Sequence, residues 1–310
     1  MKNKNILITG GLGFIGSHIA NELLDDNRVV ILDNLSTGKL DNLKDTNHEN
    51  LKIIKADIRN TNLDSLTSDI DYVFHLAAMA SVPLSIDKPT ECCEINLNAT
   101  LELLNSAVNN DVKKVIFSSS SSVYGQNRNM PLKESEPPMP MSPYAASKAS
   151  CELYLKAFHE SYGLDYVALR YFNVFGPGQD KNSQYAAVIP NFISAVLENT
   201  RPEIYGDGEQ TRDFVFVNDV VRANVNAAES DYNGIINVAS GKKMSINQLY
   251  EIVKKTLDSN LEPKYLPERQ GDIKHSLADI TNMEKISFKV DSSDFDEQLE
   301  ETINWFRTIL

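Results

Sequence analysis

The sequence predicts an α/β fold in which a doubly wound parallel sheet carries a smaller α/β lobe. Two observations indicate this class. Through the first 170 residues, apolar runs typical of buried strands alternate with segments whose apolar residues recur every 3.6 positions. The first apolar run also leads, through a glycine-rich loop, into a helical pattern. At 310 residues and 42% hydrophobic content, the chain is long enough to bury the core that this fold requires.

The N-terminal segment has the pattern of a dinucleotide-binding loop. An apolar run at 5–9 is followed by Gly10, Gly13 and Gly16, and then by a helical pattern. Glycines at this spacing turn the chain tightly, bring backbone N–H groups against a pyrophosphate and place a helix N-terminus beneath its negative charge. A glycine turn that only packs a helix on a strand is the alternative, but the strand before the loop and the helix after it favour a Rossmann-type binding site.

The next strands bear on the choice of dinucleotide. An apolar run at 29–32 ends in Asp33, where a carboxylate would hydrogen-bond a ribose hydroxyl and repel a 2′-phosphate. The sequence therefore favours NAD over NADP as the cofactor. Asp57 ends the third predicted strand and could meet an adenine edge, although a turn or helix-capping aspartate is an equal alternative.

The remaining elements continue the alternation. Strands are predicted at 51–56, 72–76, 112–117, 164–169 and 234–238, and helices at 90–109, 142–162, 187–197, 218–229, 245–257 and 295–309. The loops lengthen after Arg170, and the strand at 234–238 is expected to return to the sheet. We therefore expect an NAD-binding Rossmann domain over residues 1–170, with a return segment near 213–240, and a substrate-binding lobe over residues 171–310.

Composition and charge exclude several other classes of function. A net charge of −13 argues against a nucleic-acid partner and against binding to anionic membranes. No apolar run approaches the roughly 20 residues of a membrane span, and the N-terminus runs directly into the first strand, so we expect a cytoplasmic protein. The three cysteines form no disulfide framework, and the scattered cysteines and histidines show no metal-ligand spacing.

Tyr144 and Lys148 are candidate catalytic residues. A helix is predicted to begin at this point, with Ser142 as N-cap and Pro143 at the first helical position. Four-residue spacing stacks the phenol and the ammonium on one face, and a neighbouring positive charge lowers the pKa of a phenol from about 10. The same spacing also occurs by chance on solvated helices, so the pair needs support from the rest of the sequence. A run of five serines, 118–122, directly after the strand at 112–117 favours a hydroxyl-rich active-site turn over a flexible linker.

Taken together, these residues resemble the extended short-chain dehydrogenase/reductase family, and within it the NAD-dependent nucleotide-sugar 4-epimerases. The resemblance rests on Thr9-Gly10-x-x-Gly13-x-x-Gly16, on His75-Leu76-Ala77-Ala78 and on the Tyr144–Lys148 pair. It implies that Tyr144, Lys148 and Ser120 are catalytic. It also implies that NAD is bound by Gly10, Gly13, Phe14, Ile15, Gly16, Asp33, Asn34, Ser36, Thr37, Gly38, Asp57, Ile58, Leu76, Ala77, Ala78, Asn96, Tyr144 and Lys148.

The resemblance extends into the second lobe, where it implies a UDP-sugar substrate. Arg170-Tyr171-Phe172-Asn173 and Arg269-Gln270-Gly271-Asp272 are similar to family motifs that hold the nucleotide sugar. Arginines pair bidentately with phosphate oxygens, although each could instead be a surface ion-pair residue. The implied substrate-binding residues are Ser81, Ser120, Ser122, Tyr144, Asn173, Val188, Tyr205, Arg212, Arg269, Asp272 and Ser276.

The implied reaction is reversible hydride transfer at sugar C4 through a 4-keto intermediate. Where the 4,6-dehydratases have an Asp-Glu pair, this chain has Ser121 and Ser122, which supply no carboxylate for dehydration. Small Ser276, at a position where galactose-only members have tyrosine, predicts room for an N-acetyl group, so that both UDP-glucose and UDP-N-acetylglucosamine would be substrates. A UDP-glucuronate 4-epimerase or decarboxylase, a net dehydrogenase and an NAD-sensing regulator without turnover remain alternatives. The resemblance further implies a homodimer formed through the helices at 90–109 and 142–162.

Overall fold

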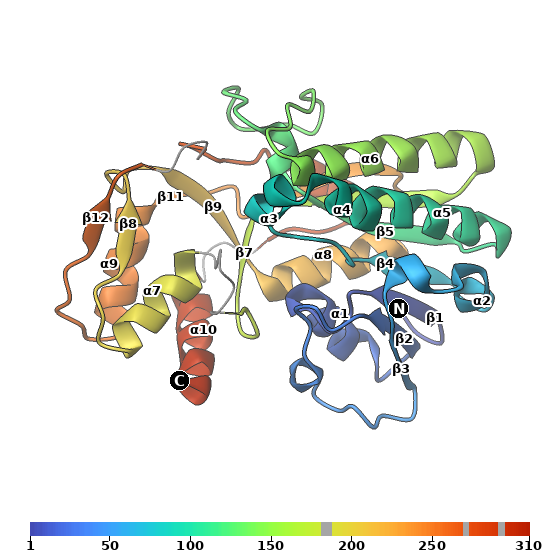
Figure 1. The fold of residues 1–310 in the computed structure, drawn as a ribbon, viewed down its shortest axis with the longest axis horizontal. Helices are drawn as coiled ribbons and strands as arrows, with labels where there is room; N and C mark the ends of the chain where they lie inside the picture. Colours follow the sequence, from blue (N-terminus) through green and yellow to red (C-terminus); the bar gives the residue numbers. More distant parts are fainter. Residues whose placement is uncertain (181–187, 269–272, 291–294) are drawn as a thin grey trace.

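The computed structural model describes residues 1–180, 188–268, 273–290 and 295–310. Its centre is a sheet of seven parallel strands in the order β10-β6-β5-β4-β1-β2-β3 (Figure 1). The strands are β1 (Asn5–Thr9), β2 (Arg28–Asp33), β3 (Leu51–Lys55), β4 (Tyr72–His75), β5 (Lys114–Ser120), β6 (Asp165–Tyr171) and β10 (Gly234–Val238). The strand order reverses between β1 and β4, which is where a doubly wound sheet binds ligands. The predicted fold class is confirmed.

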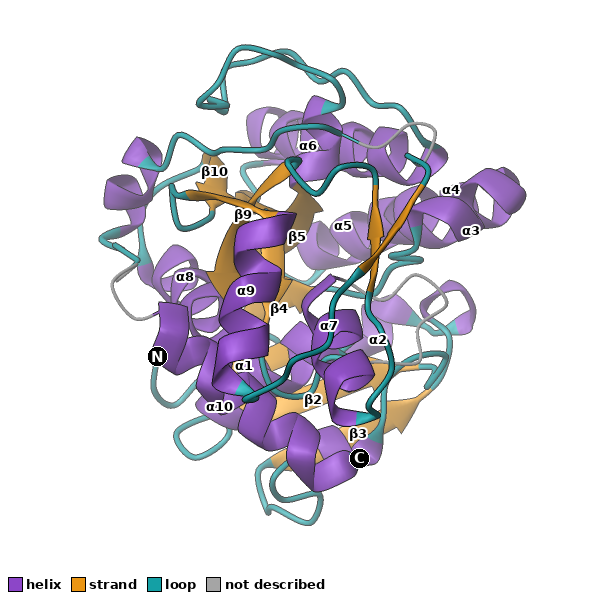
Figure 2. Ribbon diagram, turned by 90° about the vertical axis from the view of Figure 1, so that its left-hand side faces the viewer, coloured by secondary structure: helices purple, strands orange, loops and turns teal. Residues whose placement is uncertain are grey.

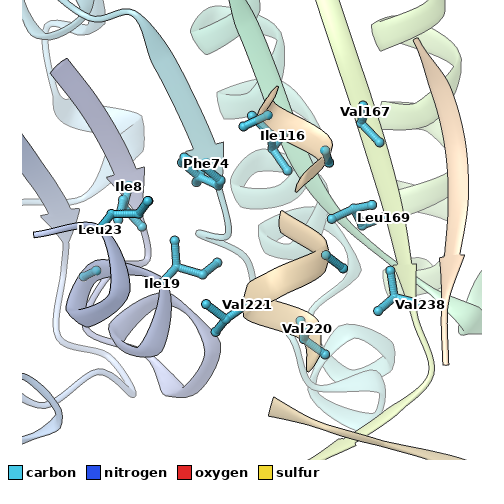
Figure 3. Close-up of a cluster of buried hydrophobic side chains, with 14 of the residues drawn as sticks. Ile8, Ile19, Leu23, Phe74, Ile116, Val167, Leu169, Val220, Val221 and Val238 are labelled. Carbon is cyan, nitrogen blue, oxygen red and sulfur yellow. The ribbon is translucent and has the colours of Figure 1, made fainter. Parts of the chain in front are cut away.

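Two helical layers cover the sheet, one on each face. Helices α1 (Phe14–Leu23) and α8 (Val217–Glu229) pack on one face, and their apolar side chains meet those of the strands in a continuous core (Figure 3). In that core Ile19 and Val220 are completely buried beside Ile8 and Phe74. The opposite face is covered by α2 (Leu63–Thr67), α5 (Ala99–Asn109) and α6 (Pro143–Tyr162), which bury a second cluster around Leu103 and Leu155.

The segment predicted as one helix over 90–109 is interrupted. Helix α4 (Pro89–Cys93) continues into a π-helical segment, η3 (Glu94–Asn98), before α5 begins at Ala99. A short helix α3 (Val82–Asp87), which the sequence did not predict, precedes it. A π-helical turn inserts one extra residue per turn and redirects the side chains within it. Asn96 is one of these side chains, and it is directed into the protein.

The second lobe is built on two small sheets. Strands β7 (Asn173–Phe175), β9 (Thr211–Phe216) and β11 (Lys243–Ser245) form one, and β8 (Glu203–Tyr205) pairs with β12 (Lys264–Leu266) in the other. Figure 2 looks onto this lobe, with α7 (Val188–Leu197), α9 (Ile246–Thr256) and α10 (Phe295–Ile309) toward the viewer. Their apolar faces enclose a third core around Phe192 and Phe306.

Short helical turns complete the described chain: η1 (Leu40–Asn42), η2 (Ile58–Asn60), η4 (Ser121–Tyr124) and η5 (Thr281–Ile286). The strand at 234–238 returns to the large sheet beside β6, as the sequence predicted. Strand β5 begins and ends later than the predicted 112–117, so that it runs through Ser118, Ser119 and Ser120. No helix in the described parts of the chain is long and apolar enough to cross a membrane.

Candidate active site

A cavity of about 350 Å³ lies at the carboxyl ends of the strands of the large sheet. It combines residues from the glycine loop, from the ends of β2, β3 and β4, and from β5 and α6. Of the eighteen residues expected to bind NAD, sixteen line it: Gly10, Gly13, Phe14, Ile15, Gly16, Asp33, Asn34, Ser36, Thr37, Asp57, Ile58, Leu76, Ala77, Ala78, Tyr144 and Lys148. Segments far apart in the sequence therefore form one site.

The glycine loop packs closely against the backbone around it, so that only glycine fits at two of its positions. Gly10 has a φ of +70°, and a Cβ there would lie 2.7 Å from the amide nitrogen of Ala77. A Cβ on Gly16 would lie 2.2 Å from the carbonyl oxygen of Gly10. Gly13 is the N-cap of α1 and supplies no side-chain acceptor to the first N–H groups of this helix. The N-terminus of α1 therefore presents N–H groups and the positive end of the helix dipole to an anion, as a dinucleotide pyrophosphate requires.

Asp33 lies at the end of β2, where the sequence places a ribose partner. Its side chain is 8% exposed and accepts hydrogen bonds from the backbone N–H groups of Leu12, at 3.0 Å, and Leu35, at 2.8 Å. These two bonds fix the carboxylate between the glycine loop and the loop after β2 while it still lines the cavity. The negative charge at this position fits the ribose of NAD and opposes a 2′-phosphate.

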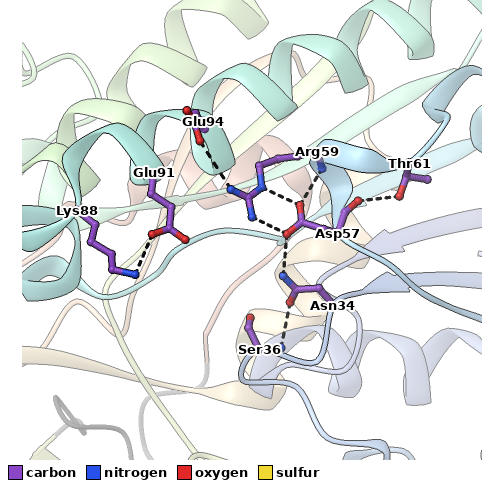
Figure 4. A network of polar contacts seen from close by, with 8 residues as sticks. All are labelled: Asn34, Ser36, Asp57, Arg59, Thr61, Lys88, Glu91 and Glu94. Atoms are coloured by element: carbon purple, nitrogen blue, oxygen red, sulfur yellow. Dashed lines mark hydrogen bonds and ion pairs between the residues drawn. The ribbon is translucent and has the colours of Figure 1, made fainter.

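Asp57 belongs to a polar network at the edge of the cavity, beside the ends of β2 and β3 (Figure 4). Its carboxylate accepts from Nε and Nη2 of Arg59, at 2.9 and 2.8 Å, and from Nδ2 of Asn34 at 3.2 Å. The guanidinium of Arg59 holds the pKa of this carboxyl well below its usual range. Asp57 is also the N-cap of η2, so the capping role that the sequence left open is present in the structure, beside the cavity that the residue lines.

Tyr144 and Lys148 project from the first turns of α6 into the same cavity. Ser142 caps this helix by accepting from the N–H of Ala145 at 3.2 Å, which fixes where the helix starts. The ammonium of Lys148 donates to the carbonyl oxygen of Ser118 at 2.7 Å and lies 5.9 Å from the centre of the Tyr144 ring. Strand β5 thus anchors the lysine, and the neighbouring Ser120 at its end contacts the Tyr144 side chain.

The two catalytic candidates have pKa values displaced by burial. Burial lowers the pKa of Lys148 to about 8. It raises the pKa of the Tyr144 phenol, because the hydroxyl lies deep in the protein although the residue as a whole is partly exposed, and the Ser120 side chain opposes this shift. The sequence predicted that Lys148 would lower the pKa of Tyr144. That lowering is not what these side chains produce, because desolvation of the phenol outweighs a lysine whose ammonium is directed to Ser118.

Two residues expected to bind NAD do not line the cavity. Gly38 lies behind Asp33, and a Cβ there would come within 2.9 Å of the Asp33 carboxylate. Asn96 is buried, with Oδ1 accepting from the N–H of Met79 at 2.7 Å and Nδ2 donating to Ser147 Oγ at 3.0 Å. Asn96 therefore ties the loop after β4 to α6 rather than facing a ligand.

Other residues of the cavity were not among those expected to bind NAD, although Ser118 and Ser119 belong to the serine run expected at the active site. They are Leu32, Ala56, Met79, Ala80, Ile95, Ser118, Ser119 and Tyr171. Most of these residues are next in the chain to a predicted residue at the end of a strand. Their place at the strand ends could therefore have identified them from the sequence. Tyr171 differs, because it comes from the end of β6 and reaches the site only through the packing of the sheet. Its hydroxyl lies 3.1 Å from Ser118 Oγ.

The residues expected to bind the substrate fall into two groups. Ser120 contacts the Tyr144 side chain, and the buried hydroxyl of Ser122, two residues later, has no hydrogen-bond partner among the described residues. In the second lobe, Ser276 is buried, and its N–H donates to the carbonyl oxygen of Thr211 at 3.1 Å, next to Arg212. Asn173 is attached to the same strand, because Nδ2 donates to the carbonyl oxygen of Asp213 at 3.1 Å.

The remaining substrate-binding candidates are less closely grouped. Ser81 caps α3 by accepting from the N–H of Leu84, and Val188 begins α7. Tyr205 lines a separate cavity of about 140 Å³ with Lys274 and His275. Arg269 and Asp272 lie outside the described residues. Among the residues that are described, no group of three or more His, Cys, Asp or Glu side chains could hold a metal ion.

Comparison with known proteins places these features in a family. A family model described as the NAD dependent epimerase/dehydratase family matches residues 6–239. A UDP-N-acetylglucosamine 4-epimerase from Methanobrevibacter ruminantium M1, solved in complex with UDP-N-acetylmuramic acid, is 63% identical over 100% of both chains, with a TM-score of 0.99. A UDP-glucose 4-epimerase from Thermotoga maritima, solved with UDP-glucose, is 40% identical over 98% of this chain and 99% of that one, with a TM-score of 0.93. A putative UDP-glucose 4-epimerase from Methanocaldococcus jannaschii is 39% identical over 97% of this chain and 98% of its own length.

Proposed function

The chain belongs to the NAD-dependent epimerase/dehydratase family as a nucleotide-sugar 4-epimerase, and we propose that it inverts C4 of UDP-N-acetylglucosamine as well as of UDP-glucose. The observation that carries the choice of sugar is Ser276. The residue is small and buried, and its backbone N–H is bonded to Thr211 on β9, beside Arg212. By the family resemblance this position lies next to the 2-substituent of the sugar, where a large side chain would take the room of an N-acetyl group. The 63% identical relative, which is named for UDP-N-acetylglucosamine, supports the same choice.

The cofactor is NAD, and the residues of the large cavity fit it. The glycine loop and the N-terminus of α1 would hold the pyrophosphate, and Asp33 would hold the adenosine ribose. When bound, NAD supplies an acceptor for the C4 hydride, returns the hydride to the opposite face and contributes a positively charged ring. We assign to Lys148 the orientation of the nicotinamide ribose, because its ammonium is fixed in the cavity by Ser118.

Within this site Tyr144 is the proton acceptor. Burial raises the pKa of Tyr144, so the phenolate that accepts a proton would depend on the positively charged ring of bound NAD. The phenolate oxygen would take the proton from the sugar 4-hydroxyl as the C4–H bond breaks, and would give it back when C4 is reduced. Ser120 hydrogen-bonds the same sugar oxygen from the end of β5. The 4-keto sugar turns over between the two hydride transfers while Arg212 and Arg269 hold its diphosphate, so the configuration at C4 inverts and no cofactor is consumed.

The assignment of NAD and the sugar nucleotide to different residues also gives each lobe its own role. We propose that residues 1–170, with the return segment near 213–240, hold NAD and the catalytic residues, and that residues 171–310 hold the nucleotide sugar. We also propose that the protein is a homodimer joined through the helical segments at 90–109 and 142–162. Several large apolar side chains are exposed on α6, and half-buried leucines lie on the neighbouring segments.

Proton NMR of the purified protein, without added cofactor, tests the proposal. UDP-glucose, UDP-N-acetylglucosamine and UDP-glucuronate are incubated separately with the protein. We expect the anomeric signals of the 4-epimers to grow in for the first two sugars, with no accumulation of absorbance at the reduced-nicotinamide band. Conversion of UDP-glucuronate alone, or loss of its carboxylate as carbon dioxide, would contradict the proposal. If added NAD is needed for turnover, only tight retention of NAD is contradicted.

A further inference from the structure

Asp213 is a buried carboxylate in β9 to which the catalytic mechanism assigns no role. Its side chain is 0% exposed and accepts four hydrogen bonds. Oδ1 accepts from the backbone N–H of Ser240 at 2.8 Å and from Ser240 Oγ at 2.7 Å. Oδ2 accepts from the backbone N–H of Ala278 at 3.1 Å and from that of Gly241 at 3.2 Å. Four donors therefore converge on one carboxylate, and all of them are neutral.

The donors come from separate parts of the chain that surround the proposed sugar site. Ser240 and Gly241 follow β10, the edge strand of the large sheet. Ala278 lies two residues after Ser276, in the segment that runs beside β9. The main chain of the same aspartate takes part as well, because its carbonyl oxygen accepts from Nδ2 of Asn173. One residue thus joins β9 to three other segments.

The segment at 274–278 is also held by contacts other than those of Asp213, among them the 3.1 Å contact between Thr211 Oγ1 and His275 Nδ1. Its backbone is bonded to Thr211 on β9 through Lys274 and Ser276, and to Leu132 through Leu277. Asp213 adds the bond to Ala278, whereas Thr211 bonds the segment at Lys274 and at Ser276. An ionised carboxylate suits this position, because backbone N–H groups can only donate. Burial raises the pKa of Asp213 to about 6 and the four donors oppose that shift, so the group is ionised at pH 7.

We propose that Asp213 is the positioning residue of the sugar-nucleotide site, and that its carboxylate fixes the segment bearing Ser276 against the strand bearing Arg212. The identity of the ligand rests on the proposed function, whereas the role of Asp213 in holding the 274–278 segment against β9 does not. Asp213 needs no contact with the ligand for this role. Its loss would let the 274–278 segment move relative to β9, so that the sugar and the diphosphate could no longer meet their partners at the same time.

The test is Asp213→Asn, which keeps the size of the side chain but presents an NH₂ group to donors. Isothermal calorimetry on the NAD-loaded protein measures the affinity for UDP-N-acetylglucosamine, and steady-state kinetics separate KM from kcat. We expect the affinity to fall and KM to rise at least tenfold, with kcat changed less than threefold and the NAD content unchanged. The calorimetric measurement does not need turnover. A wild type that binds the sugar nucleotide without converting it would therefore count against the proposed function and leave the positioning role intact.

Ser245→Ala is the matched control in the same lobe. Ser245 is buried in β11, next to β9, and caps α9, so its loss also destabilises the lobe but touches none of the four donors. We expect its KM to stay within twofold of the wild type. An equal rise of KM in both variants, or an unchanged KM in Asp213→Asn, would overturn the positioning role. If Asp213→Asn does not fold, Ser240→Ala removes the single hydroxyl donor, and a KM within experimental error of the wild type would overturn the proposal in its place.

Discussion

At the residue scale, Lys148 is a buried lysine, and burial disfavours the charged form of its side chain. The side chain is 4% exposed, its ammonium has the Ser118 carbonyl as hydrogen-bond acceptor, and it lies 4.7 Å from the centre of the Phe117 ring. Burial lowers its pKa to about 8, whereas the unfolded value is about 10.5. The charged form therefore costs about 3 kcal/mol of stability at pH 7. That cost is fully present below pH 8, decreases as pH rises to 10.5, and vanishes above it.

Replacing this lysine should separate stability from activity. We expect Lys148→Met to raise the free energy of unfolding at pH 7 by about 2 kcal/mol, because the buried charge is removed and one hydrogen bond of about 1 kcal/mol is lost. The gain should shrink between pH 8 and 10.5. The same variant should lower kcat by a factor of about 100 or more. Urea unfolding at pH 7 and pH 10, with initial rates, measures both effects.

Lys114 provides the control for a buried ammonium away from the cavity. It is also 4% exposed, burial lowers its pKa, and it donates to the carbonyl oxygens of Ala227 and Ser230 at the end of α8. Lys114→Met should leave kcat unchanged. If Lys148→Met is less stable than the wild type at pH 7, the hydrogen bond to Ser118 stabilises the protein by more than the burial of the charge destabilises it.

The proposed choice of sugar rests on one side chain, Ser276, and can be tested at that residue. We expect Ser276→Tyr to abolish conversion of UDP-N-acetylglucosamine and to keep that of UDP-glucose within about fivefold, because a phenol ring would occupy the space for the N-acetyl group. Ser276→Ala, which keeps the space, should convert both sugars. NMR rates for each variant with each sugar measure the ratio. If the tyrosine variant converts UDP-N-acetylglucosamine as fast as the wild type, the choice of sugar is determined by residues other than Ser276.

The structure brings together the residues that the sequence singled out by local spacing. The glycine loop and the Tyr144–Lys148 pair need only neighbouring positions in the chain, and all of these residues line one cavity. The sequence could not foresee the partners of Asn96, because the direction of that side chain is set by a helix distortion and by residues 17 and 51 positions away. The pKa of Tyr144 also could not be foreseen, because it depends on how deeply packing buries the hydroxyl.

At the scale of the element, the π-helical segment η3 links the cofactor cavity to the catalytic helix. Its Asn96 side chain bonds both backbone groups of Met79, which lines the cavity, and the hydroxyl of Ser147 on α6. Thr100, one turn later, donates to the Asn96 carbonyl and lies 2.8 Å from Nε2 of His75. Burial lowers the pKa of His75 to about 3, so this imidazole is neutral and bridges Thr100 to Thr9, just before the glycine loop.

Removing the amide of Asn96 should loosen the cofactor cavity. We expect Asn96→Ala to lower the free energy of unfolding by about 2–3 kcal/mol, because the buried N–H and C=O groups of Met79 lose their partner. The dissociation constant for NAD should rise about tenfold, since the loop after β4 is no longer held. Thermal unfolding and the NAD content after extensive dialysis measure the two effects.

Asn110→Ala controls for a general loss of stability. Asn110 lies at the other end of α5, and its Nδ2 donates to three acceptors, the Asp64 and Ser106 carbonyls and Thr67 Oγ1. The variant should be destabilised to a similar degree and still retain NAD. Equal loss of NAD from both variants would mean that Asn96 acts through global stability alone.

At the scale of the whole molecule, the parallel sheet was predictable and the second lobe was less so. Buried parallel strands are continuous apolar runs, so each strand of the large sheet stands out in the sequence. Strands β7, β8, β11 and β12 have only three residues each, and β8 pairs with a segment some sixty positions away. Such short strands exist only through non-local pairing, whereas the amphipathic helices of the same lobe show a 3.6-residue period and were predicted.

The surface of the large lobe supports the proposed dimer. Leu153 is 67% exposed, Tyr154 42% and Tyr162 63%, all on α6, and Leu97 and Leu101 are half-buried on the neighbouring segments. Leu153 and Tyr154 are adjacent on this helix, and exposed large apolar side chains that lie together mark interfaces more often than free surface. We expect light scattering to give about twice the chain mass of 34.6 kDa. Leu153→Asp should halve that mass, because a carboxylate buried at a two-fold interface would face its own copy.

A variant elsewhere on the surface separates this interface from general solubility. Ile309, 48% exposed at the end of α10 in the second lobe, is an apolar residue far from α6 in the fold (Figure 1). Ile309→Asp should keep the dimeric mass, and both variants should keep NAD because neither residue lines the cavity. A wild-type mass of 34.6 kDa at micromolar concentration would contradict the dimer. A dimer that survives Leu153→Asp would move the interface away from α6, since one uncompensated carboxylate on each copy costs several kcal/mol when buried.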